Sequence, residues 1–243
     1  MRLRLIACEI FARPIYALAA ESPHVVDIEL VQRGLHLYPA KLRNELQSRI
    51  DQNQAGRYEA ILLGYGLCGM AAAGLKAREL PLILPRAHDC ITFFLGSRAR
   101  YNQEFTACPG TYWYTLDSVE REDASGATLT MGAGTDLDLQ SAYQDYIQKY
   151  GKDNADYLME AMGAWQSHYR RAAAIDLGVG NFGPVEARAR ADAGRRHWEY
   201  EEIQGNLGIF KRLLWGEWDA DFLRVPPGKT IAMEPGENIL TAA

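Results

Sequence analysis

The sequence has 243 residues, a formal net charge of −5 and four cysteines, and 48% of its residues are hydrophobic. A chain of this size can bury a full core, as one large domain or as two smaller lobes. The negative charge gives no electrostatic basis for binding nucleic acid or anionic lipid, and no apolar run is long enough to cross a membrane. Four scattered cysteines and an N-terminus without the pattern of a signal peptide favour a reduced, cytoplasmic protein.

The first half of the chain alternates apolar runs of strand length with segments of helical period. Strands are expected at residues 2–8, 24–31, 58–66, 80–85 and 111–117. Helices are expected at residues 39–56, 68–79 and 89–105, the last with Asp89 as its N-cap. Continuous apolar strands that alternate with helices are typical of a mainly parallel sheet covered by helices on both faces. The sequence therefore predicts an α/β fold.

Residues 118–136 form a polar, glycine-rich stretch that interrupts this pattern and is the best candidate for a lid or linker. Helices are expected at 137–150 and 155–169, and strands and helices then alternate again. The stretch RRAAAIDLG echoes YEAILLGYG in the first half, which fits either two similar Rossmann-like lobes or one sheet extended by both halves. We expect an α/β lobe at 1–117 that carries the site, a loop or lid at 118–136, and a second α/β part at 137–243 packing on the first.

Cysteines and histidines follow four of the predicted strands at the point where each strand ends. Cys8 closes the first strand, His36 follows the second, Cys68 follows the third, and His88 and Cys90 follow the fourth. Because ligands of open parallel sheets bind outside the carboxyl ends of the strands, we expect these side chains to share one edge. This convergence is the strongest chemical signal in the sequence.

Thiols and imidazoles are ligands for zinc or an iron–sulfur cluster rather than for magnesium or calcium. The predicted metal ligands are Cys8, Cys68, Cys90 and His88. Helix N-termini expected beside Cys68 and Cys90 would lower the pKa of both thiols. Taken singly, however, each cysteine is more typical of a small buried side chain, and no C-x-x-C or H-E-x-x-H spacing supports a metal motif. Cys108 precedes the fifth strand, and we interpret it as structural.

Other polar residues at the same strand ends are weaker candidates. Glu9, Asp89 and Asp176 could serve as acid–base groups or orient an imidazole, although Asp89 is equally expected to be only a helix cap. The glycines of GYGLCG would let the backbone and a ligand approach closely. The predicted ligand-binding residues are Gly64, Gly66, Gly69, Arg86 and His36.

Four stretches carry a resemblance: LGYGLCG, PRAHDCITFFLGSRARY, PGTYW and the late WEYEEIQGNLGIFKRLLWGEWDADFLRVPPGKTI. Together they resemble the bacterial and archaeal family called domain of unknown function 1638, over nearly the whole chain. Members of that family are often associated with corrinoid-dependent methyltransferase systems, so the resemblance implies one-carbon metabolism. Residue by residue, it covers Cys8, His36, Cys68, His88 and Cys90.

These observations lead to one expected function and two alternatives. The expected function is a zinc-dependent enzyme of methyltransferase type, which transfers a methyl group between a small-molecule substrate, or a thiol, and a corrinoid protein. The first alternative is an iron–sulfur redox or accessory protein, for example one that reactivates an oxidised corrinoid. The second is a non-catalytic carrier of a small ligand or metal.

Overall fold

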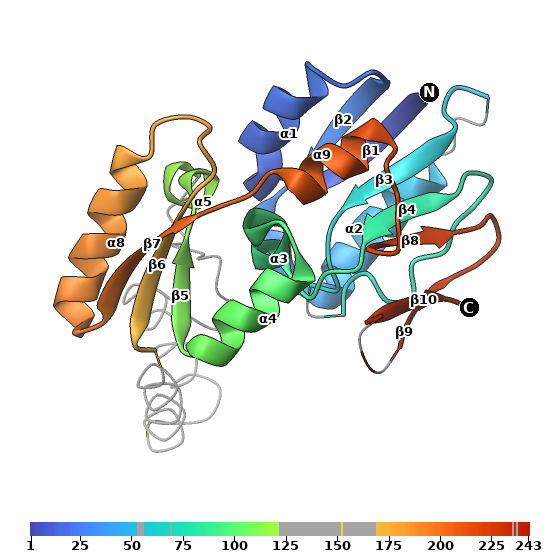
Figure 1. The fold of residues 1–243 in the computed structure, drawn as a ribbon. Helices are drawn as coiled ribbons and strands as arrows, with labels where there is room; N and C mark the ends of the chain where they lie inside the picture. Colours follow the sequence, from blue (N-terminus) through green and yellow to red (C-terminus); the bar gives the residue numbers. More distant parts are fainter. Residues whose placement is uncertain (53–55, 69, 122–151, 153–168, 235, 237) are drawn as a thin grey trace. The chain divides into compact units, whose positions relative to one another are not determined.

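The structure, a computed structural model, describes residues 1–52, 56–68, 70–121, 152, 169–234, 236 and 238–243 (Figure 1). The helices expected at 137–150 and 155–169 and most of the expected lid at 118–136 lie outside these residues. The chain divides into two compact units. The first comprises Met1–Asn102, Leu177–Val179 and Gln204–Ala243, and the second Gln103–Asp176 and Gly180–Ile203. This division differs from the ranges 1–117 and 137–243 expected from the sequence.

A mostly parallel sheet forms the centre of the first unit, as the α/β prediction requires. Its strands run in the order β2-β1-β3-β4-β8. The first four are parallel to their neighbours, and β8 pairs antiparallel with β4. The strands are β1 (Arg2–Cys8), β2 (Val25–Val31), β3 (Ala60–Gly64), β4 (Leu82–Pro85) and β8 (Phe222–Val225). The finer prediction of two similar Rossmann-like lobes stays a prediction.

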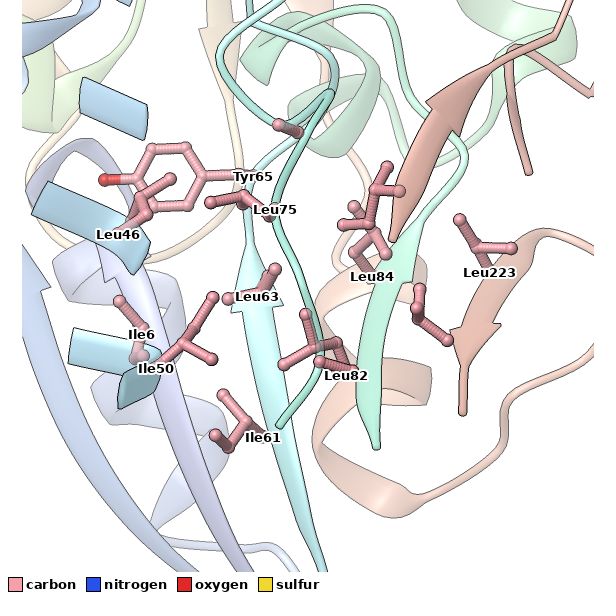
Figure 2. Packing of buried hydrophobic residues seen from close by; sticks show 14 of the residues in the cluster. Ile6, Leu46, Ile50, Ile61, Leu63, Tyr65, Leu75, Leu82, Leu84 and Leu223 are labelled. Atoms are coloured by element: carbon pink, nitrogen blue, oxygen red, sulfur yellow. The ribbon is translucent and has the colours of Figure 1, made fainter. Parts of the chain in front are cut away.

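One face of this sheet packs against helix α2 (Pro39–Asp51). Leu42, Leu46 and Ile50 recur at helical spacing, and all three are buried, as the sequence predicts. They meet the strand side chains of one face, Ile6 and Leu63 among them (Figure 2). A hairpin of β9 (Ile231–Met233) and β10 (Leu240–Ala242) extends this core.

The other face is covered by α1 (Ala12–Ala19) and α9 (Gly208–Trp215), which pack against each other (Figure 1). Phe11 stacks on Phe93 with ring centroids 4.6 Å apart and meets Phe210 edge-on at 5.0 Å. The sequence analysis did not predict α1, although its apolar residues fall at helical spacing and Ile15 and Leu18 are buried.

Two predicted helices differ in the structure. Residues 70–79 form turns rather than a helix, because Met70 and Gly74 have positive φ and the backbone bonds across to another segment, with the Gly74 amide donating to Ile231 O at 2.8 Å. The helix expected at 89–105 is two helices, α3 (Cys90–Leu95) and α4 (Arg98–Ala107). Gly96 separates them with a left-handed φ of 81°.

The second unit contains a three-stranded sheet in the order β5-β6-β7, with β5 and β6 parallel. Its elements are β5 (Thr111–Tyr114), α5 (Leu116–Glu120), β6 (Arg171–Asp176), α8 (Gly183–Arg196) and β7 (Glu199–Gln204). Val185, Ala189 and Ala193 of α8 pack on this sheet. The predicted fifth strand therefore belongs to this sheet and not to the one that carries the cysteines. No described helix is long and apolar enough to cross a membrane.

Candidate metal centre

Three cysteines lie at the carboxyl ends of three adjacent strands. Cys8 is the last residue of β1, Cys68 lies four residues beyond the end of β3, and Cys90 is the first residue of α3, which follows β4. Strand β3 lies between β1 and β4 in the sheet, and all three are parallel. The structure thus places Cys8, Cys68 and Cys90 at the same edge of one sheet.

Two glycines allow neighbouring chain segments to pack closely at this edge. A Cβ on Gly64 would lie 2.5 Å from the Ala7 Cβ on β1, and a Cβ on Gly66 would lie 2.7 Å from the Ala87 carbonyl oxygen. Both distances are too short for a side chain, so only glycine fits at either position. The glycines of GYGLCG therefore allow close contact between neighbouring chain segments. Gly69, the third predicted glycine, lies outside the described residues.

The turn that carries Cys68 is held against the loop after β4. The Leu67 amide donates to Ala87 O at 2.8 Å, and the Cys68 amide donates to His88 O at 3.0 Å. Cys68 itself has a φ of 45°, in the left-handed region that side chains other than glycine and asparagine seldom adopt. Such strain persists where the surroundings impose it and is concentrated at functional sites.

The three thiols act on one another electrostatically. Burial, with a smaller contribution from Glu9, raises the pKa of Cys8 to about 12. Burial, followed by the charges of Asp89 and Cys8, raises the pKa of Cys68 to about 12. Burial, Asp89 and the other two cysteines raise the pKa of Cys90 well above its usual range. Since such interactions weaken with distance, the three thiols share one neighbourhood.

The predicted lowering of the thiol pKa values is wrong. No helix follows Cys68, and burial at Cys90 outweighs the effect of the short helix α3. Each residue keeps part of its surface accessible, yet protein atoms crowd each thiol. At neutral pH these are protonated thiols, so without a bound cation they are poor nucleophiles.

Nearby backbone amides act in the opposite sense at all three thiols. Those of Ile10, Gly66 and Cys90 favour a lower pKa at Cys8, Cys68 and Cys90 respectively. They oppose the larger effect of burial without overcoming it. An N–H group that points at sulfur stabilises the thiolate, which is the form that binds metal. A bound cation would act in the same sense as these amides and favour the thiolates.

The two imidazoles are placed differently from the thiols. His36 lies in the 3-10 helix η2 (Arg33–Leu37), and no described group lies within hydrogen-bond distance of its buried Nε2 atom. Burial, followed by the charge of Arg33, lowers the pKa of His36 and keeps the imidazole neutral, as a metal ligand must be. His88 is exposed, and its ring stacks on Tyr101 with centroids 5.6 Å apart.

Asp89 combines the two roles that the sequence leaves open. Its carboxylate caps α3 by accepting the Ile91 amide at 2.9 Å, as predicted. It also accepts a hydrogen bond of 3.2 Å from the Tyr101 hydroxyl. Burial raises the pKa of Asp89 despite these hydrogen bonds, so its carboxyl group binds a proton more readily than that of an exposed aspartate. Tyr101, which touches both Asp89 and His88, was missed by the sequence analysis.

Glu9, Arg33 and Tyr65 also lie at this edge. Glu9 accepts the Arg33 amide at 2.8 Å, which ties the exit of β1 to η2. Tyr65 is buried, and its hydroxyl lowers the pKa of Cys8 through a weak contact, while no described group lies at good hydrogen-bond geometry to it. Its place between β3 and Cys68 gave no chemical signal in the sequence.

Thiols are ligands that a thiophilic metal prefers, but the three thiols are not arranged around a common centre in the structure. Within the described residues, no three His, Cys, Asp or Glu side chains are placed so as to hold a metal ion as they stand. Rotation about χ1 moves a thiol without moving the backbone, so strand ends that are neighbours can bring their sulfur atoms together. Cys108, which follows α4, belongs to the second unit and has no place in this set.

Residues 30–214 match the family described as Protein of unknown function (DUF1638). The matched stretch covers well over half of the chain. The chain belongs to this family. No curated protein and no solved structure matches it. The DUF1638 match includes Cys68, Cys90 and both imidazoles of the edge, and begins after Cys8.

Proposed function

We propose that this DUF1638 protein binds zinc through Cys8, Cys68 and Cys90 and uses it in methyl transfer between a small molecule or thiol and a corrinoid protein. The observation that carries the metal site is the position of three neighbouring thiols at the carboxyl ends of adjacent parallel strands. The one-carbon direction rests on the resemblance of the sequence alone. When bound, zinc supplies a Lewis acid that favours the thiolate and activates a thiol for transfer.

The residues of the chain have separate tasks in this proposal. The three cysteines lose their protons to the solvent as the metal binds, because the cation offsets the burial that keeps them neutral. The imidazole of His88 or His36 completes the ligand set or stays exchangeable, which leaves a position for substrate. Asp89 lies beside Cys68 and Cys90 and is the group best placed to take up or release a proton.

An iron–sulfur cluster is the second candidate, because thiolates hold such clusters and backbone amides lie near all three thiols. N–H groups that donate to cluster sulfur atoms tune the reduction potential of such clusters. Electron transfer, for example to a corrinoid partner, would then replace group transfer. The third candidate is a carrier that binds the metal and performs no turnover.

Metal analysis of the full chain purified without oxygen tests the proposal. We expect about one zinc per chain and a colourless protein. A brown protein with iron and acid-labile sulfide would favour the iron–sulfur alternative. A metal-free protein with all four cysteines titrating as ordinary thiols would mean that the three cysteines are only buried side chains.

Turnover separates an enzyme from a carrier once the metal is identified. A zinc-loaded protein that moves a methyl group from a methyl donor to free corrinoid or to a thiol would support the enzyme. A zinc-loaded protein that leaves every donor intact would favour the carrier.

A further inference from the structure

Among the described residues, Arg86 is a cationic side chain of the strand edge that uses only part of its hydrogen-bonding groups. It follows β4 directly, four residues before Cys90, and it is partly exposed. Its Nη1 atom donates to two carbonyl oxygens of the β9–β10 hairpin, those of Asn238, at 3.1 Å, and Leu240. Those bonds use one side of the guanidinium group.

The other side of the guanidinium, the edge formed by Nε and Nη2, has no partner in the described part of the chain. Nε is shielded from solvent and lacks a hydrogen bond. Glu234 attracts Arg86, but from beyond the distance of an ion pair. A buried donor without a partner is costly and is seldom left so unless a ligand or water completes it.

Arg78 shows the Nε–Nη2 side of a guanidinium group when a carboxylate is bound to it. Its Nε donates to Asp51 Oδ1 at 2.7 Å and its Nη2 to Asp51 Oδ2 at 3.2 Å. This two-point arrangement is the geometry with which arginine binds a carboxylate or a phosphate group. Arg86 has the same two donors without a partner in the described chain, and a bound group reaches the shielded Nε once the atoms that cover it move aside.

The charge near Arg86 also favours an anion. The Arg86 amide donates to Asp221 O at 2.7 Å, so Arg98, which pairs with the Asp221 carboxylate, lies in the same neighbourhood. Arg98 is neutralised by Asp221, with an Nη2–Oδ1 distance of 3.1 Å, whereas no carboxylate of the described residues lies at ion-pair distance from Arg86.

We propose that the Nε–Nη2 edge of Arg86 binds an oxyanion, the carboxylate or phosphate group of a small molecule. The inference deepens the proposed function, on which it rests for the idea that a small molecule reacts at this edge. It assigns the substrate class: an anionic compound, anchored at Arg86 while its reacting end reaches the thiols. The binding itself needs no metal.

The test follows the Nε–Hε signal of Arg86 in the metal-free full chain by ¹H–¹⁵N NMR, with the signal assigned by its loss in Arg86→Lys. Malonate and inorganic phosphate are added separately, at ionic strength held constant with chloride. We expect a saturable shift of this signal with one or both probes. A preference between them identifies the group. A shift that fails to saturate, or that chloride reproduces, overturns the proposal.

Matched variants separate the two-point contact from charge alone. Arg86→Lys keeps a positive charge and a donor for the hairpin carbonyls, and should weaken oxyanion binding at least about tenfold. Arg78→Gln, at an edge that is already filled, should leave the affinity unchanged, and Glu234→Gln should raise it. Equal affinity in Arg86→Lys and the unaltered chain would overturn the proposal.

Metal content of the same variants keeps this inference distinct from the proposed function. We expect Arg86→Lys to retain zinc while it loses oxyanion affinity. Oxyanion binding that depends on Arg86 in a chain that never binds metal would refute the zinc site and leave the anion site standing.

Discussion

Both units contain buried polar side chains, which differ in how many hydrogen-bond and ion-pair partners they have among the described residues. In the second unit, buried Arg171 contacts Glu104 at 3.0 Å, Glu201 at 2.6 Å and the Thr111 hydroxyl at 2.9 Å. Asp192, also buried, accepts hydrogen bonds from Tyr114 at 2.9 Å and from Arg188 at 3.0 Å, and pairs with Arg195. Each of these charged side chains has several hydrogen-bond or ion-pair partners within its own unit.

At the strand edge of the first unit, several buried polar groups lack such partners among the described residues. Cys68 and Cys90 have raised pKa values because burial and Asp89 oppose their ionisation, and no cation is among the main influences on either. His36 and Tyr65 add buried polar atoms that no described group satisfies. Complete polar networks stabilise a fold, whereas incomplete ones at one edge indicate that something else binds there. The proposed metal site lies at this edge of the first unit.

The largest expected effect is on metal content. Cys8→Ser, Cys68→Ser or Cys90→Ser should each reduce bound metal in the anaerobically purified chain to a tenth or less, because a serine hydroxyl does not replace a thiolate toward zinc. Cys108→Ser is the matched control and should retain full metal. Elemental analysis measures both. Retention of full metal by all three edge variants would remove the distinction between the two units.

The next effect is on folding of the second unit. Arg171→Met should lower the free energy of unfolding by about 3 kcal/mol, because it leaves Glu104, whose side chain is only 15% exposed, without its cation. Urea denaturation measures this change. Glu186→Gln, which removes an ion pair between exposed side chains, is the control and should leave the urea midpoint unchanged. An equal loss in both would show that Arg171 is not a structural centre.

The pH dependence of stability in acid provides a third test of the comparison between the two units. Burial would raise the pKa of Asp192, but hydrogen bonds from Arg195, Arg188 and Tyr114 outweigh it and hold the pKa below its usual range. A depressed folded-state pKa means that the stabilisation is complete above the unfolded pKa of about 3.9 and is lost as pH falls through the folded value. The stability difference between the unaltered chain and Asp192→Asn should therefore be constant near neutral pH and shrink below about pH 4. A difference that grows on acidification would contradict this assignment.

How far the sequence could predict these features depends on the range of the interactions involved. Continuous apolar runs end at Cys8 and just before Cys68 and Cys90, so the shared edge followed from local patterns and from the rule for parallel sheets. The pairing of β8 with β4 brings together segments more than a hundred residues apart, and no local pattern specifies it. The pairing of β5 with β6, which places the fifth strand in the second unit, was missed for the same reason.

The thiol pKa values show a different limit. The sequence analysis expected helix N-termini to lower them, but Gly74, with a φ of 91°, and the bonds of its segment to β9 replace one of those helices by turns. Burial then decides the sign at all three thiols. Burial is a property of the packed chain, as are the contacts of Tyr65 and Tyr101, so neither could be obtained from residue types and spacing.

Two tyrosines provide the smallest and most direct comparison of the two units. Tyr114 donates to Asp192, so Tyr114→Phe should lower the free energy of unfolding by about 1.5 kcal/mol. Tyr65 is equally buried, but its hydroxyl lacks a full hydrogen bond, so Tyr65→Phe should cost nothing and could raise stability by up to about 1 kcal/mol. Urea denaturation of both variants without metal measures the pair.

The same two variants then distinguish a ligand site from a packing defect. Because the Tyr65 hydroxyl favours the thiolate of Cys8, Tyr65→Phe should weaken zinc binding in a competition titration with a chelator, while Tyr114→Phe should not. Loss of metal affinity without loss of stability is what a group kept for a ligand would produce. If Tyr65→Phe instead lowers stability and leaves metal affinity unchanged, the Tyr65 hydroxyl serves the fold, and the contrast between the two units fails at this residue.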